Sequence, residues 1–168
     1  NKNIFDLILK KSKLVSINAQ TNSDNRGFNL ITKYNDAHLI CVDEPEIRLA
    51  LSDRISTFKT LAENLSKKIR FNILVITRGN SGISIFKKTA KKKLKEISLS
   101  AFELNPVDTI GAGDAAYGIA SLLSSRKIDS EIVAFLGNIF GALATKYIGH
   151  SSNIKKNDVL KAVTYSLK

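Results

Sequence analysis

Apolar residues in this chain occur in two patterns that follow one another repeatedly. Short apolar runs predict buried strands at 14–17, 37–42, 72–77 and 83–86, with one or two further strands within 94–104. Apolar residues at helical spacing predict helices over 1–11, 28–34, 47–69, 115–123, 130–148 and 156–166. We expect the helix over 47–69 to be broken near Ser52-Asp53. This alternation of strands and helices favours an α/β fold with a doubly wound, mostly parallel sheet.

Composition narrows the class of protein. The chain has 168 residues, of which 43% are hydrophobic and 24% charged, as in an ordinary globular domain. No apolar stretch approaches the roughly 20 residues of a membrane span, no signal peptide is visible, and the single Cys41 cannot form an internal disulfide. We therefore expect a cytoplasmic protein. Because the sequence contains no methionine, we also expect a fragment or processed piece of a longer protein.

The charge is strongly positive, with a formal net charge of +11 and six lysines within 87–95. Such a balance allows nucleic acid, an anionic membrane or anionic small ligands as partners. The lysine cluster is read first as the solvated tip of a hairpin, and it contains no aromatic side chain on which single-stranded bases could stack. A basic nucleic-acid-binding domain stays open as a less favoured alternative.

The stretch 105–123, NPVDTIGAGDAAYGIASLL, carries the clearest chemistry. Gly111, Ala112 and Gly113 precede a helix of small and apolar residues, so their N–H groups can turn towards one point at the positive end of that helix. Such a turn suits a phosphate, and Asp114 beside it could accept the proton of an attacking hydroxyl. The alternative is that the glycines form only a helix-entry turn, with Asp114 as its N-cap.

The string DTIGAGD followed by this helix resembles the C-terminal motif of the ribokinase-like (PfkB) carbohydrate and nucleoside kinases. The resemblance implies that Gly111, Ala112 and Gly113 form the anion hole of a kinase and that Asp114 is its catalytic base. In several relatives the first Asp of this string and the loop that follows the next helix hold a monovalent cation. By resemblance, Asp108 and the loop 149–153 would hold K⁺.

A second segment, D-E-P-E at 43–46, resembles the family's N-x-x-E motif, which is linked to Mg²⁺ and phosphate binding. The resemblance implies that Glu46 places Mg²⁺ through water and that Asp43, where the family usually has Asn, lies at the nucleotide site. Oxygen ligands and retained waters suit Mg²⁺. The alternative is structural: Pro45 fits the first turn of a helix, and the carboxylates complement the helix dipole.

Two further matches concern the nucleotide. The segment 77–82, TRGNSG, resembles the family's T-x-G-x-x-G segment, which implies that Thr77, Gly79 and Gly82 border the phosphates. Arg78 stands where an apolar residue is common, and it could bond a phosphate or point to solvent. Asn138 matches a position that contacts nucleotide in the family, although an asparagine in an apolar helix is more often satisfied by packing.

The resemblance covers essentially the whole chain and corresponds to the C-terminal portion of a ribokinase-like three-layer fold. It implies phosphoryl transfer from ATP, with Mg²⁺, to a hydroxyl of a sugar or sugar phosphate. The N-terminal half, with the lid and most sugar contacts, is not in this sequence, so we expect the isolated chain to be inactive. A non-catalytic nucleotide-binding module is the alternative.

The subgroup and the partners follow from the same resemblance. The stretch 18–34 and D-E-P-E look most like the heptose-phosphate kinase modules of ADP-heptose synthesis, which are often fused to a nucleotidyltransferase. The expected partners are therefore the other half of the kinase and such a fused domain. The sequence leaves the oligomeric state open.

Overall fold

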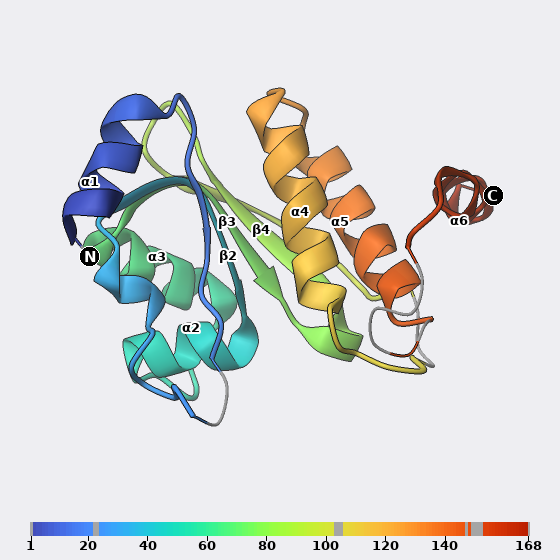
Figure 1. Ribbon diagram of the computed structural model, residues 1–168, viewed down its shortest axis with the longest axis horizontal. Coiled ribbons are helices and arrows are strands. Elements are labelled where there is room, and N and C mark those ends of the chain that lie inside the picture. Colours follow the sequence, from blue (N-terminus) through green and yellow to red (C-terminus); the bar gives the residue numbers. More distant parts are fainter. Residues whose placement is uncertain (1, 22–23, 103–105, 147, 149–152, 168) are drawn as a thin grey trace. The chain divides into compact units, whose positions relative to one another are not determined.

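The fold is described from a computed structural model, which divides the chain into two compact units. The first comprises residues 1–76 and 84–96, and the second comprises 77–83 and 97–168. Within them the structure describes residues 2–21, 24–102, 106–146, 148 and 153–167 (Figure 1).

Five strands form one sheet in the order β1-β2-β3-β4-β5. They are β1 (Ser16–Asn18), β2 (Asp36–Asp43), β3 (Arg70–Thr77), β4 (Ile83–Lys88) and β5 (Leu94–Leu99). β1 and β2 pair in parallel, with Ile17 opposite Ile40. β2 is connected to β3 through two helices, whereas short turns join β3 to β4 and β4 to β5. All five predicted strand regions are confirmed.

The helices of the first unit lie to one side of its strands in Figure 1. They are α1 (Lys2–Lys11), α2 (Glu44–Leu51) and α3 (Phe58–Lys68), with a single 3₁₀ turn, η1 (Ile31–Lys33). Consecutive buried residues near the ends of β2 and β3, at 39–42 and 73–76, show that both faces of these strands are covered. Strands covered on both faces have continuous apolar runs, which explains the sequence pattern.

One prediction about the helices of the first unit is confirmed and another is wrong. The expected break near Ser52-Asp53 is present, because Ser52 adopts a left-handed conformation with φ of 54° and ends α2. Asp53 then accepts hydrogen bonds from the N–H groups of Ile55 and Ser56, which fixes the turn before α3. The helix predicted over 28–34 is only the 3₁₀ turn η1.

The second unit is helical and contains α4 (Ala112–Ser125), α5 (Ser130–Ala144) and α6 (Lys156–Ser166). α4 and α5 lie side by side (Figure 1). Their approach is close because a Cβ on Gly141 would lie only 3.6 Å from the carbonyl oxygen of Ala112 at the start of α4. The small residues of α5 thus bring its C-terminal part against the first turn of α4.

α5 ends four residues before the predicted position 148. The carbonyl oxygen of Thr145 accepts hydrogen bonds from the N–H groups of Val107 and Asp108, at 2.9 and 3.1 Å. This oxygen therefore accepts hydrogen bonds from the segment before α4 instead of from a further turn of α5. In the part of the chain that is described, no helix is both long and apolar enough to cross a membrane.

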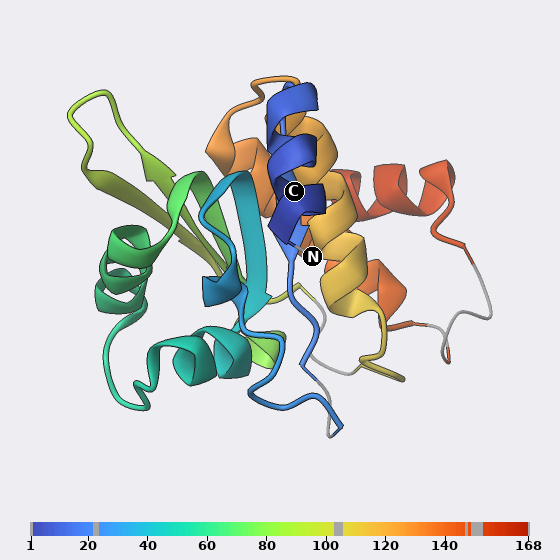
Figure 2. The ribbon, with the colours of Figure 1, turned by 60° about the vertical axis from the view of Figure 1, so that its left-hand side comes forward.

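The lysine-rich stretch forms the tip of the β4–β5 hairpin, as predicted (Figure 2). Lys91, Lys92 and Lys93 are exposed there. Nearer the sheet, the Nζ of Lys88 lies 5.1 Å from the centre of the Phe71 ring, a cation–π contact. The hairpin thus carries six of the chain's lysines within residues 87–95.

Candidate functional site

The glycine turn, residues 106–114, leads directly into α4. Gly111 is the N-cap of the helix and has a left-handed conformation, with φ of 82° and ψ of −5°. Side chains other than glycine rarely adopt such angles, which explains the residue type at this position. The alternative prediction that Asp114 caps the helix is wrong, because the cap is Gly111 and Asp114 lies in the first turn.

Asp108 shapes the same turn. Its Oδ1 accepts a hydrogen bond of 2.9 Å from the N–H of Ile110, an Asx turn that folds the chain back towards the helix. Its own N–H is held by Thr145 at the end of α5. Backbone hydrogen bonds thus hold Asp108 on both sides of the turn. Its proposed role in cation binding stays a prediction.

The first turn of α4 contains the N–H groups whose role as anion donors is a prediction. The first N–H groups of a helix have no partners within it. Here Ala112 N–H makes a long bond of 3.3 Å to the carbonyl oxygen of Thr109. Gly113 is exposed, and a Cβ built on it meets no atom within 4 Å. Asp114 follows, also exposed. The positive end of α4 is therefore open to an anion, with a carboxylate beside it.

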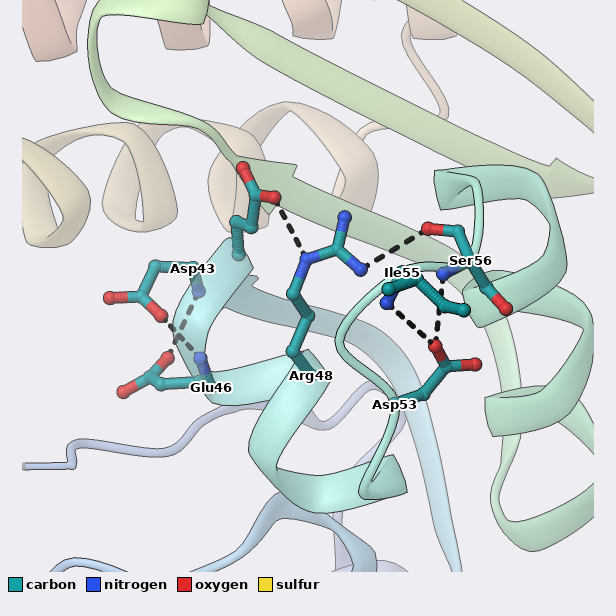
Figure 3. Close-up of polar contacts among 7 residues, drawn as sticks. Asp43, Glu46, Arg48, Asp53, Ile55 and Ser56 are labelled. Atoms are coloured by element: carbon teal, nitrogen blue, oxygen red, sulfur yellow. Dashed lines mark hydrogen bonds and ion pairs between the residues drawn. The ribbon is translucent and has the colours of Figure 1, made fainter.

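The D-E-P-E segment forms a complete capping box at the start of α2 (Figure 3). Asp43 Oδ1 accepts from the N–H of Glu46 at 2.7 Å, and Glu46 Oε2 accepts from the N–H of Asp43 at 3.0 Å. Pro45 occupies the first turn, where its missing N–H costs nothing. The structural alternative for this segment is therefore confirmed.

Glu46 has a second function in the fold. Its other oxygen, Oε1, accepts a hydrogen bond of 3.0 Å from the N–H of Thr21, which ties the polar loop after β1 to the start of α2. The proposed role of Glu46 in placing Mg²⁺ through water stays a prediction. Among the described residues, no group of three or more His, Cys, Asp or Glu could hold a metal directly.

The pKa values of two carboxyl groups near α2 shift in opposite directions. Desolvation raises the pKa of Asp43, helped by the charge of Glu44 and opposed by the bond from Glu46 N–H. Hydrogen bonds from the backbone and side chain of Ser56 lower the pKa of Asp53. The folded state therefore disfavours the charge on Asp43 and favours the charge on Asp53.

We expect Asp43→Asn to raise the free energy of unfolding at pH 7. The gain should be less than about 1 kcal/mol, because Asp43 is only partly removed from water and solvent screens its charge. Asparagine keeps the capping oxygen and removes a charge that the folded state disfavours. The folded pKa of Asp43 lies above its unfolded value of 3.8, so the gain disappears as pH falls through this range. Urea unfolding of both proteins at pH 7 and below pH 3.8 measures it.

Asp53→Asn provides the control of opposite sign. Its folded pKa lies below 3.8, so the charged form stabilises the fold above that value and this contribution is lost as pH falls. The variant should be less stable than the natural chain at pH 7. Equal effects of the two substitutions at pH 7 would contradict the assignment of the charges.

The turn 77–82 follows β3 and is closed by a hydrogen bond of 2.8 Å from Arg78 N–H to the carbonyl oxygen of Gly82. Gly79 has φ of 52° and open space around its Cβ position. Gly82 has φ of 94°, and a Cβ there would lie 2.1 Å from the carbonyl oxygen of Leu99. Gly82 is therefore required by close packing against the backbone after β5.

Arg78 does not simply point to solvent, and its bond to a phosphate stays a prediction. Its Nη2 donates to the carbonyl oxygen of Leu99 at 3.1 Å and to that of Ile83 at 3.4 Å. Asn138 is buried in α5, and its Nδ2 donates to the carbonyl oxygen of Ser100. These contacts match the packing alternative for Asn138, and its contact with nucleotide stays a prediction.

The candidate residues divide between the two units. Asp43 and Glu46 belong to the first, whereas Thr77, Gly79, Gly82, Asp108, Asn138 and the glycine turn belong to the second. Residues 149–152 of the proposed cation loop and Asn105 lie outside the described residues. The sequence did not predict that Arg78 and Gly82 pack against the backbone at the end of β5. No local sequence pattern marks contacts between residues that lie so far apart in the chain.

Comparison with known proteins identifies relatives along the chain. The family model described as pfkB family carbohydrate kinase matches residues 10–157. A candidate sugar kinase of Pyrococcus horikoshii is 26% identical over 157 residues, covering 91% of this chain and 47% of that protein. The chain thus spans about half the length of this relative.

Solved structures show the same fold. A mutant of phosphofructokinase-2 from Escherichia coli matches with a TM-score of 0.77 and 14% identity, over 99% of this chain and 51% of the other. Ribokinase from Thermotoga maritima matches with a TM-score of 0.71 and 19% identity, over 94% and 52% of the two chains. The predicted ribokinase-like α/β class is confirmed.

Two further similar structures contain ligands. A candidate ribokinase II from E. coli, in complex with ATP and Mg²⁺, has a TM-score of 0.62 and 20% identity, over 78% of this chain and 39% of the other. Phosphofructokinase-2 from E. coli in complex with potassium has a TM-score of 0.67 and 17% identity, over 80% and 42%.

Proposed function

Because the chain belongs to the pfkB family of carbohydrate kinases, we propose that it is the C-terminal, nucleotide-binding portion of an ATP-dependent kinase acting on a sugar or sugar phosphate. The observation that carries the proposal is the start of α4, where exposed Gly113 and Asp114 follow the left-handed Gly111. Neither packing nor a positive φ requires a glycine at 113, whereas a bound phosphate needs the space.

Each residue of the turn has a distinct part in this proposal. The N–H groups of Gly111, Ala112 and Gly113 stabilise negative charge on the transferring phosphoryl group; loss of one such donor costs about 3 kcal/mol in comparable sites. Asp114 accepts the proton of the attacking hydroxyl. Its position in the first helical turn holds the carboxylate beside these donors.

The remaining candidate residues serve nucleotide and ions. Thr77 and Gly79 border the nucleotide, Glu46 holds Mg²⁺ through water, and Asp108 contributes to a K⁺ site. Mg²⁺ supplies neutralisation of phosphate charge when it is bound. The complexes of similar kinases with ATP and Mg²⁺ and with potassium support this set of cofactors.

Two further proposals concern the identity of the phosphoryl acceptor and a non-catalytic alternative. The Thr21–Glu46 bond joins the polar loop to the D-E-P-E segment, the two features that resemble heptose-phosphate kinases. Heptose phosphates are therefore the first acceptors to screen. Since the chain spans about half of its relatives, the competing proposal is a nucleotide-binding module that phosphorylates nothing by itself.

The proposal is tested by calorimetric titration of the chain with Mg²⁺-ADP. We expect binding by the natural sequence and at least tenfold weaker binding by an Asp108→Ala, Gly113→Val double variant, because it loses the Asx turn and fills the space before α4. Gly118→Val is the control, because a Cβ there also meets no atom within 4 Å but lies farther along α4.

Two outcomes would count against the proposal. Equal affinity of the natural chain and the double variant for Mg²⁺-ADP would contradict the proposal that the phosphate binds at the glycine turn. Absence of binding in the natural gene product that contains this chain would remove the nucleotide site altogether. Phosphorylation of an acceptor by that gene product would exclude the non-catalytic alternative.

A further inference from the structure

The backbone that leaves β5 is held from several sides within the second unit. This β5 exit segment, residues 99–102, has no regular secondary structure after Leu99. It directly precedes the stretch that enters the glycine turn. Its placement therefore bears on where the turn begins.

The β3–β4 turn holds one side of the exit segment. The guanidinium of Arg78 donates to the carbonyl oxygen of Leu99, and this charged hydrogen bond is stronger than a neutral one. Gly82 lets the turn lie directly against the exit segment, since its absent Cβ would fall 2.6 Å from Ser100 C and 2.7 Å from Ala101 N.

α5 holds the same segment through side chains on two of its turns. Asn138 donates to the carbonyl oxygen of Ser100. The ring of Phe102 packs edge-on against Phe135, with 5.4 Å between the ring centres. Residues 99–102 are thus held between the β3–β4 turn and α5.

The glycine turn itself is attached to the same helix farther along. Val107 and Asp108 donate to Thr145 just beyond α5, and Gly141 faces the carbonyl oxygen of Ala112. The connection between β5 and α4 is therefore anchored on α5 at both ends. In the sequence only three residues separate the exit segment from the glycine turn.

We propose that Arg78 is a positioning residue of the kinase site: it binds the carbonyl oxygens of Leu99 and Ile83, and with Asn138 it fixes the exit segment that places the glycine turn. Arg78 acts on the turn through the backbone and is not a phosphate ligand. The inference deepens the proposed function and rests on it for what the turn binds.

Hydrogen exchange of the ligand-free chain distinguishes a positioning role of Arg78 from a role as a phosphate ligand. We expect Arg78→Met to speed exchange at the amides of Val107, Asp108 and Ile110 by about tenfold, the scale of losing one charged hydrogen bond. Amides in the middle of α5 should keep their protection. Arg78→Lys should restore part of the protection, because a point charge can replace one of the two bonds.

Arg126→Met is the matched control, since it removes an exposed charge at the end of α4 and should leave these amides unchanged. Should Arg78→Met fail to fold, Asn138→Ala removes the donor to Ser100 from the opposite side and should speed exchange at the same amides.

The affinity for Mg²⁺-ADP completes the test. Unchanged exchange in Arg78→Met together with weaker binding would make Arg78 a phosphate ligand and overturn the inference. Unchanged exchange and unchanged binding would overturn it as well. If the natural chain binds no Mg²⁺-ADP while the variant exchanges faster, the positioning role stands and the proposed function fails.

Discussion

Asp114→Asn in the natural gene product that contains this chain is expected to lower the turnover of sugar phosphorylation by about 10²–10⁴-fold, the usual contribution of a general base. Asparagine has nearly the same shape but cannot take a proton at neutral pH. The position lies in the first turn of α4, next to the N–H groups proposed to hold the phosphoryl group.

Nucleotide binding should survive this substitution. A carboxylate beside an anion site repels phosphate, so its removal leaves the affinity for ATP equal or slightly higher. The expected signature is thus a large fall in kcat with an unchanged or lower KM for ATP. Steady-state kinetics with the acceptor identified in the screen measure both quantities.

Asp158→Asn is the matched control for this experiment. Asp158 lies in the first turn of α6, as Asp114 does in α4, so the substitution removes the same charge from the positive end of a helix. It should leave kcat unchanged. Turnover close to that of the natural enzyme in Asp114→Asn would contradict the assignment of the catalytic base.

Local patterns predicted most elements of this fold because their causes are local. β2 and β3 are apolar over 39–42 and 73–76, where both faces are covered, so continuous runs marked them as buried strands. The start of α2 was marked by Pro45 and its flanking carboxylates, which form a capping box between residues three apart. The helix predicted over 115–123 is also confirmed as α4, although it begins three residues earlier, at Ala112.

Elements whose ends depend on distant contacts were predicted less well. α5 stops at Ala144 because the carbonyl oxygen of Thr145 binds Val107 and Asp108, which lie far earlier in the chain. The apolar pattern of 130–148 gives no sign that the carbonyl oxygen of Thr145 is bound by residues outside the helix. The break between α2 and α3 near Ser52, in contrast, was predicted from the sequence.

The candidate site shows the same division. The DTIGAGD and D-E-P-E strings identified the glycine turn and the capping box, since each is one continuous segment. In contrast, the partners of Arg78 and Asn138 are Leu99 and Ser100, which are 21 and 38 residues away. The motifs predicted that these residues lie near the nucleotide. Their hydrogen bonds to backbone carbonyl groups could be found only from the three-dimensional structure.

Gly82→Ala is expected to cause the largest loss of stability of any substitution considered, about 3 kcal/mol or more in the second unit. The new Cβ would lie 2.1 Å from the carbonyl oxygen of Leu99, and backbone atoms cannot move aside as a flexible side chain can. In addition, alanine would have to adopt φ of 94°, which costs a further 1–3 kcal/mol or so.

Gly79→Ala separates the two contributions. Gly79 also has a positive φ, of 52°, but a Cβ there meets no atom within 4 Å, so only backbone strain of about 1–2 kcal/mol is expected. Urea unfolding followed by circular dichroism, with amide exchange of α5 as the readout for the second unit, compares the variants in the absence of any ligand.

The comparison decides what Gly82 does in this protein. A ligand-free loss of stability in Gly82→Ala that clearly exceeds that in Gly79→Ala assigns Gly82 to packing of the exit segment. Equal losses would mean that residues 99–101 yield to a methyl group. A segment that yields so easily could not hold the glycine turn in place, so that result would also weaken the positioning role of Arg78, whose guanidinium binds this segment at the carbonyl oxygen of Leu99.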